Sequence, residues 1–98
     1  MDKMVMAMQI RAARAALKWK QAELAQRSGI SEPAINRIER GESEPRYSTF
    51  SSILSAFRKA GIMLDNSPDR GFSMFFDTET IFATINEVDN SHRNIEND

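Results

Sequence analysis

The first part of the chain alternates amphipathic segments with short polar or glycine-containing breaks. In the first segment, which runs from Met4 to Trp19, Ile10, Ala13 and Leu17 recur at helical spacing with basic residues between them. Alanine, a strong helix former, is frequent in this segment. The pattern therefore predicts an amphipathic helix that buries its apolar face and is closed by Trp19, packed on the core.

Two shorter helices are predicted next, joined by a tight turn. The first spans about residues 21–28 and is stopped by Gly29, because glycine tolerates the left-handed conformation that ends helices. The second follows Ser31, a good N-cap residue, and carries Pro33 in its first turn, where a missing N–H costs nothing. This third helix is expected to end near Gly41.

A fourth helix is predicted to have Ser48 as its N-cap and to stop at Gly61. Arg58 and Lys59 fall in its last turn, where they complement the negative end of the helix dipole. Its apolar residues, which have the i, i+3, i+4, i+7 spacing of a buried helix face, are Phe50, Ile53, Leu54 and Phe57.

After Gly61 the apolar pattern changes from helical to alternating. Residues 62–65 and 71–76 flank the turn-rich segment NSPDR, so two short strands in a hairpin are predicted. A lone hairpin is marginal in water, and this one is therefore expected to lie against the helices or to pair with a second subunit. The alternating apolar residues are Ile62, Leu64, Phe72, Met74 and Phe76.

A last helix is expected from about Thr78 to Val88, with Asp77 as its cap. Its apolar side would consist of Ile81, Phe82, Ile85 and Val88. The polar end of the chain, DNSHRNIEND, is expected to be disordered. The elements together predict a mainly α fold: a compact bundle of four or five helices over residues 1–61, followed by a strand pair and an acidic segment over residues 62–98.

The two parts of the chain carry opposite charge, although the net charge is only −1. Residues 1–61 contain eleven Lys+Arg and six Asp+Glu, a difference of +5, whereas residues 62–98 contain two Arg and eight acids, a difference of −6. A basic body with an acidic tail favours a polyanionic partner for the first part. An ordinary solvated surface explains the charge equally well, so charge alone leaves both readings open.

Several classes of function lack the residues they need. The chain has no cysteine, which excludes disulfides, cysteine-ligated zinc and thiol catalysis. It contains no Gly-rich phosphate loop and no nucleophile motif, so an enzyme is not expected. The methionines are expected to pack and His92 stands alone, so neither a metal nor another cofactor is predicted. An apolar run of about 20 residues and a signal peptide are both absent, so no membrane association and a cytoplasmic location are expected.

The segment AELAQRSGISEPAINRIERG, residues 22–41, meets the spatial demands of a helix-turn-helix. Such a motif needs a small residue at the closest approach, a positive-φ residue in the turn, an apolar anchor after it, and an apolar seam between the helices. The residues that meet these demands are Ala25, Gly29, Ile30, Leu24, Ile35 and Ile38. Each match alone is weak, but together they favour a helix presented to a DNA groove over ordinary core packing.

Residues 9–60 resemble the Cro/C1-type, or XRE-type, helix-turn-helix domain of phage repressors and bacterial regulators. The resemblance is clearest in QAELAQRSGIS, INRIERGESEPR and the closing helix. It implies a lambda-repressor-like bundle of four or five helices that binds double-stranded operator DNA, usually as a homodimer. Some relatives continue into a short strand pair, as this chain does.

The resemblance also implies which side chains meet DNA, because the family's third helix lies in the major groove. Gln21 would bond a phosphate and brace this helix. Asn36 would bond adenine, and Arg37 would bond guanine or a phosphate. Glu32 departs from the family's usual glutamine, repels phosphate, and can accept from cytosine or cap its own helix. Lys20 replaces the family's usual Ser/Thr N-cap, at a cost of about 1 kcal/mol, and is expected to reach a phosphate in exchange.

The loop before the fourth helix lies along the sugar-phosphate backbone in this family, where contacts position the protein without reading sequence. The full set of expected DNA-contacting residues is Lys20, Gln21, Ser31, Glu32, Pro33, Asn36, Arg37, Arg40, Arg46, Tyr47 and Ser48. Glu39 has a structural role by the same resemblance, paired with an arginine of the first helix. Arg11 and Arg14 both qualify.

Three functions remain open from the sequence. The first is a transcriptional regulator, a repressor that binds a palindromic operator as a homodimer, with half-sites about one helical turn apart. The second is an antitoxin that represses its own operon and binds a toxin through residues after Gly61, which are acidic and aromatic. The third is a dimerisation module without DNA binding, because Glu32 weakens the groove face. Phe72, Met74 and Phe76 are predicted to bury a dimer surface.

Overall fold

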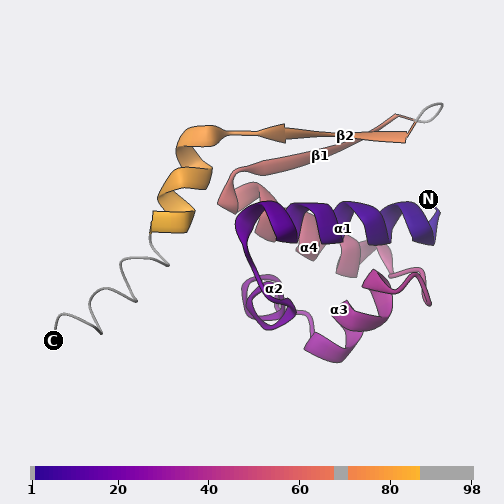
Figure 1. Ribbon diagram of the computed structural model, residues 1–98. Helices are drawn as coiled ribbons and strands as arrows, with labels where there is room; N and C mark the ends of the chain where they lie inside the picture. The colour runs from indigo at the N-terminus through magenta and orange to yellow at the C-terminus, as the bar shows by residue number, and fades with distance from the viewer. Residues whose placement is uncertain (1, 68–70, 87–98) are drawn as a thin grey trace, which may run out of the picture.

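The computed structural model describes residues 2–67 and 71–86 and confirms a mainly α fold with a short hairpin. Figure 1 shows α1 and α4 in the middle of the molecule, with α2 and α3 on one side and the hairpin on the other. Residues 78–86 form one more helix. The labelled elements are α1 (Lys3–Leu17), α2 (Gln21–Ser28), α3 (Glu32–Glu39), α4 (Tyr47–Ala60), β1 (Ile62–Ser67) and β2 (Gly71–Phe76).

Helix α1 ends earlier than the sequence pattern predicts. Lys18 takes a left-handed conformation with φ 60°, and its N–H donates to the Ala15 carbonyl at 3.1 Å. The N–H of Trp19 donates to the Arg14 carbonyl at 3.0 Å, which completes the C-terminal cap. Trp19 therefore lies outside the helix, where its ring is free to turn into the core.

The predicted N-cap of α4 is wrong. Arg46 holds that position in an extended conformation, and Ser48 lies inside the first turn, where its carbonyl accepts from the Ser52 hydroxyl at 3.0 Å. The helix begins two residues early because the Phe50 N–H bonds the Arg46 carbonyl at 3.0 Å, which brings the buried Phe50 into the core. Local capping preference is outweighed here by burial of an aromatic ring.

The core lies between the four helices and the start of β1. Its largest fully buried apolar side chains are Phe57, Ile10, Leu24, Ile35, Ile53 and Ile62. Trp19 is 4% exposed and stacks on Phe57 with ring centroids 5.8 Å apart, and the Arg27 guanidinium lies 4.7 Å from the Trp19 ring centroid. These contacts tie the α1–α2 junction to α4.

The hairpin packs by the alternation that the sequence predicts. Ile62 pairs with Phe76, and Leu64 pairs with Met74, so the predicted apolar residues share one face of the two-stranded sheet. Ile62 is fully buried, and Leu64 and Met74 pack at the edge of the core. A second anchor is polar: the side-chain amide of the buried Gln9 donates to the Asn66 side-chain oxygen at 2.8 Å.

The C-terminal helix begins as predicted and turns Ile81 and Ile85 of the predicted apolar side toward the core. The Asp77 carboxylate accepts from the Thr80 N–H at 3.3 Å, which confirms the cap. Ile81 and Thr84 are buried, and the Thr84 hydroxyl donates to the Ala60 carbonyl at 3.3 Å. Phe82 is 62% exposed, so its predicted place on the apolar side is wrong.

The error at Phe82 has a simple geometric reason: positions three and four apart share a helix face, so Ile81 selects Thr84 and Ile85 as its neighbours. Val88 and the polar segment 89–98, for which sequence predictions were made, lie outside the described residues. In the part of the chain that the structure describes, no helix has the length and apolarity to cross a bilayer.

Candidate nucleic-acid interface

Helices α2 and α3 form the predicted helix-turn-helix. Gly29 ends α2 with φ 75°, and its N–H donates to the Ala25 carbonyl at 2.9 Å. Ile30 then packs against the core from a partly buried position. The Ser31 hydroxyl accepts from the Ala34 N–H at 3.3 Å and caps α3, as predicted. The seam between the helices is closed by Leu24, Ile35 and Ile38, which are all buried.

Because Ile35 and Ile38 occupy the inner face of α3, the rest of the helix is turned outward. Glu32, Pro33 and Arg37 are exposed, and Figure 1 shows α3 at the periphery of the bundle. Glu32 lies in the first turn, beside the positive end of the helix dipole, which favours its charge. Exposed polar side chains on an outer helix are what entry into a major groove requires.

A buried carboxylate joins α3 to the two preceding helices. Glu39 is 4% exposed, and its two oxygens accept from Arg14, Nε to Oε2 at 2.7 Å and Nη2 to Oε1 at 2.8 Å. Gln21, at the start of α2, also donates to Glu39 Oε1, at 3.3 Å. The Gln21 side-chain oxygen in turn accepts from the Asn36 amide at 3.2 Å. These bonds join Arg14 of α1 to Glu39 at the end of α3, and Gln21 of α2 to both Glu39 and Asn36 of α3.

This network settles which arginine pairs with the carboxylate. Arg14 forms the ion pair, whereas Arg11 donates to the backbone carbonyl of Glu39. Arg14 also donates to the Trp19 carbonyl at 2.8 Å, which ties the α1–α2 connection to the same cluster. The predicted bracing of α3 by Gln21 has its structural counterpart in the Gln21–Asn36 bond.

A groove between α3 and the start of α4 brings together two predicted contact residues from different elements. Arg37 comes from α3 and Arg46 from the N-cap of α4, and both line this groove, of about 360 Å³. Its other lining residues are Ala34, Ile38, Ser43, Pro45 and Thr49. Two arginines and two hydroxyl residues along one groove supply the kind of donors that bind a phosphate backbone.

Sequence reasoning missed the two hydroxyl residues of this groove, Ser43 and Thr49. They flank Arg46 in the chain, three residues to either side, and that spacing was available in the sequence. Tyr47, beside Arg46, is 82% exposed. Arg40 is exposed as well, and its Nη2 is bonded to Glu42 at 3.0 Å, while its guanidinium has further N–H groups that can donate to a phosphate.

The remaining predicted residues lie in two separate places, at the start of α2 and in the hairpin. Lys20 is the N-cap of α2 and makes no side-chain capping bond, as the sequence predicts. It is exposed and adjoins Gln21. Phe72, Met74 and Phe76 belong to β2, which Figure 1 shows on the opposite side of α1 from α2 and α3. A dimer contact through the hairpin therefore leaves the face of α3 free.

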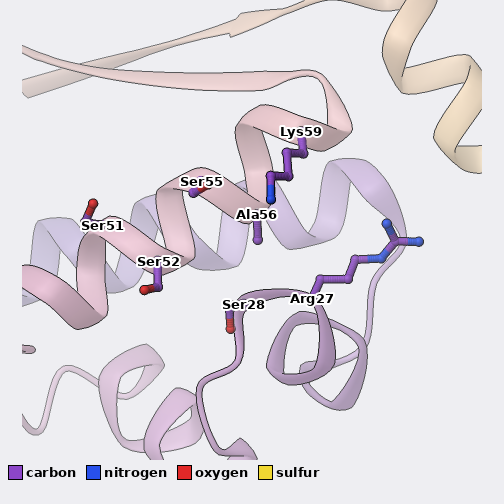
Figure 2. A pocket seen from close by; sticks show the side chains of 7 residues that line it. All are labelled: Arg27, Ser28, Ser51, Ser52, Ser55, Ala56 and Lys59. Carbon is purple, nitrogen blue, oxygen red and sulfur yellow. The ribbon is translucent and has the colours of Figure 1, made fainter.

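A second groove lies between α2 and α4 and has no converging donors. Figure 2 shows its lining residues, Arg27, Ser28, Ser51, Ser52, Ser55, Ala56 and Lys59. The serine hydroxyls point in different directions, and the Arg27 guanidinium is turned away from them. Arg27 is also paired with Glu23 at 3.4 Å and lies over Trp19.

The helical part of the chain matches a family model described as helix-turn-helix over residues 10–60. The match runs from the middle of α1 to the last residue of α4 and covers just over half of the chain. The chain belongs to the Cro/C1-type helix-turn-helix family. Members of this family are DNA-binding transcription regulators and are generally not enzymes. A search of curated proteins found no match to the chain.

Proposed function

We propose that this helix-turn-helix protein is a repressor that binds a short palindromic operator as a homodimer, with α3 in the major groove. The observation that carries the proposal is the Glu39 cluster, which fixes α3 against α1 and α2 through Arg14 and Gln21. A recognition helix held by these three bonds keeps its outer side chains in one geometry, which base readout requires. Repression then follows from occupancy of the promoter.

Asn36 and Arg37 are the base readers in this proposal. The Asn36 amide has two N–H groups, of which one is donated to Gln21. The other N–H and the side-chain oxygen remain for the N7 and N6 groups of adenine. The bond to Gln21 orients the amide before DNA arrives, which lowers the entropy lost on binding. Arg37, exposed one residue later, bonds guanine or an adjacent phosphate.

The remaining contacts follow the sugar-phosphate backbone. Arg46, Tyr47 and Ser48 act from the start of α4, and Lys20, Gln21 and Arg40 act from the ends of α2 and α3. Ser31, Glu32 and Pro33 enter the groove with the first turn of α3. Each phosphate that a basic side chain neutralises adds about 0.9 to the slope of log affinity against log salt. In this proposal residues 1–61 bind DNA and residues 62–98 form the dimer. The protein acts in the cytoplasm of a bacterium, on a host or phage operator.

Selection of binding sites from random duplex DNA tests this function, followed by titrations at two salt concentrations. We expect a palindromic consensus with half-sites about one helical turn apart. Arg37→Ala is expected to lose about 1–3 kcal/mol of binding free energy, and Asn36→Ala to relax preference at one position of each half-site. Arg58→Ala is the control, because it removes the same charge from the far end of α4.

If no sequence is enriched, or if both α3 variants bind like the parent, the protein is a module without DNA recognition. If the selected sites are single half-sites, the DNA-binding assignment stands and the homodimer does not.

One observation favours the antitoxin as a second candidate. Phe82 is 62% exposed on the helix of residues 78–86, outside the family match, and an exposed aromatic ring there fits a protein partner. Co-expression with the product of a neighbouring gene tests it. We expect a stoichiometric complex that Phe82→Asp abolishes while operator affinity is retained. An unchanged complex with this variant excludes the Phe82 surface, and absence of any complex with that product counts against the antitoxin role.

A further inference from the structure

We propose that the homodimer forms through antiparallel pairing of β2 with β2 of a second copy, which joins two hairpins into one four-stranded sheet. The inference rests on the proposed homodimer and specifies its interface down to the strand register. It gives a role to the backbone of Phe72, Met74 and Phe76, whereas the sequence pattern had pointed to their side chains.

Strand β2 forms an open edge of the sheet, because within residues 2–67 and 71–86 no strand other than β1 pairs with it. The two-stranded sheet has β1 along one side, and β1 packs on α4, whereas Figure 1 shows β2 on the outer side of the hairpin. Proteins protect such edges with charges, prolines or bulges. Residues 71–76, GFSMFF, contain neither a charge nor a proline, and each pairs one-to-one with a residue of β1. A second strand is the partner that this edge fits.

The phase of the ladder decides which backbone groups face outward. The Asp77 N–H donates to the Gly61 carbonyl at 2.8 Å, so this pair is a hydrogen-bonded one. Hydrogen-bonded and non-hydrogen-bonded pairs alternate along an antiparallel ladder. With Ile62 opposite Phe76, the alternation directs the N–H and C=O groups of Phe72, Met74 and Phe76 away from β1, toward the open edge.

Two-fold symmetry then selects one register. A residue whose backbone groups face outward must lie opposite another such residue across the two-fold axis. Phe72, Met74 and Phe76 all form hydrogen bonds with the second copy only when Met74 lies opposite its own counterpart. Phe72 then lies opposite Phe76 of the second copy. A register centred on Ser73 uses only Phe72 and Met74, and therefore forms fewer hydrogen bonds. Pairing between two copies of the same edge closes the assembly at a dimer.

The same register covers the aromatic rings that the single chain leaves exposed. Phe76 is 43% exposed and gains Phe72 of the second copy as a cross-strand neighbour. Phe75 is 62% exposed on the other face, where it comes diagonally across from Phe75 of the second copy, within reach of an aromatic ring. Because residues 71–76 carry no ionisable side chain, the two copies bring no like charges together.

Disulfide trapping tests the register, since the natural chain has no cysteine. Ser73 and Phe75 are both exposed, so Ser73→Cys and Phe75→Cys leave the core intact. In the proposed register Ser73 faces Phe75 of the second copy in a non-hydrogen-bonded pair, with Cα atoms about 4.5 Å apart, which suits a disulfide. We expect a disulfide-linked dimer when the two single variants are co-expressed and oxidised, and no disulfide-linked dimer when each variant is oxidised alone.

Sedimentation of the cysteine-free parent separates the possible failures. If the parent is a dimer and co-expression gives no cross-link, the β2 interface is wrong and the homodimer stands. If Ser73→Cys alone cross-links as well as the mixture, the strands pair in the other register, and the proposed one is overturned. If the parent is a monomer at the concentration of the trapping experiment, both the interface and the proposed homodimer are wrong.

Discussion

Arg14 of α1 and Glu39 at the end of α3 form a two-point ion pair whose carboxylate is almost fully buried. The two bonds are 2.7 and 2.8 Å long, and the Arg14 side chain is 23% exposed. A fork-to-fork pair of this kind fixes orientation as well as distance. The register of α3 on α1 is therefore held by side chains that need not touch DNA themselves.

Replacing Glu39 with alanine is expected to destabilise the fold by about 3–5 kcal/mol, because the Arg14 charge is left partly buried without its partner. Urea unfolding measures the loss. Glu42→Ala is the matched control: its pair with Arg40 is exposed, and such pairs contribute about 0–1 kcal/mol. Equal losses in the two variants would contradict the assigned role of the buried pair.

Gln21→Glu is expected to lower the melting temperature more than Gln21→Ala. The Gln21 amide donates to Glu39 at 3.3 Å, and a carboxylate there puts a second negative acceptor beside the first. Alanine only removes the bond. Gln21→Ala is also expected to bind operator more weakly, since Asn36 then loses its acceptor, which a glutamate keeps. If Gln21→Glu proves as stable as the alanine variant, the bond to Glu39 does not hold in solution.

Lys20→Ser is expected to change stability and DNA affinity in opposite directions. Lys20 is an N-cap without a capping bond, and serine at such a position adds about 0.5–2 kcal/mol of stability. If Lys20 neutralises a phosphate, its loss lowers the salt slope by about 0.9. Thermal melts and titrations at several salt concentrations measure the two effects. An unchanged salt slope would remove Lys20 from the DNA contacts.

Gly61→Ala is expected to be more destabilising than Gly29→Ala. Both glycines have positive φ, 108° and 75°, which alone disfavours alanine by about 1–2 kcal/mol. A Cβ at Gly29 meets no heavy atom within 4 Å, whereas one at Gly61 lies 2.8 Å from Ile81 and 3.0 Å from the Asp77 carbonyl. Chemical denaturation compares the two. Similar losses would mean that the C-terminal helix yields easily at this contact.

The helix-turn-helix was predictable because each of its demands is local. The geometry of a single turn requires the residue types found at Ala25, Gly29 and Ile30. Helical periodicity alone assigns Ile35 and Ile38 to the inner face of α3. The hairpin was predictable for the same reason, since alternation decides which residues share a face once the strands pair. Patterns with a period of two or of 3.6 residues carry this information directly.

The errors come from contacts between residues far apart in the chain. Ser48 is a good N-cap by propensity, yet burial of Phe50 decides where α4 begins. Phe82 was predicted on the apolar side of the last helix, but the buried residues there are Ile81 and Thr84, and the Thr84 hydroxyl lies 3.3 Å from the Ala60 carbonyl. The bond from Gln9 to Asn66 joins residues 57 positions apart, and neither local sequence indicates it.

Trp19 is the chain's single tryptophan, and its contacts with Phe57 and Arg27 make it a built-in optical probe. Unfolding exposes the indole to water and shifts its emission to longer wavelength. Docking of α3 on a duplex leaves the ring covered, because it is buried at the junction of α1, α2 and α4. Tryptophan fluorescence of an unlabelled sample therefore distinguishes a variant that has unfolded from one that is folded but no longer binds its operator.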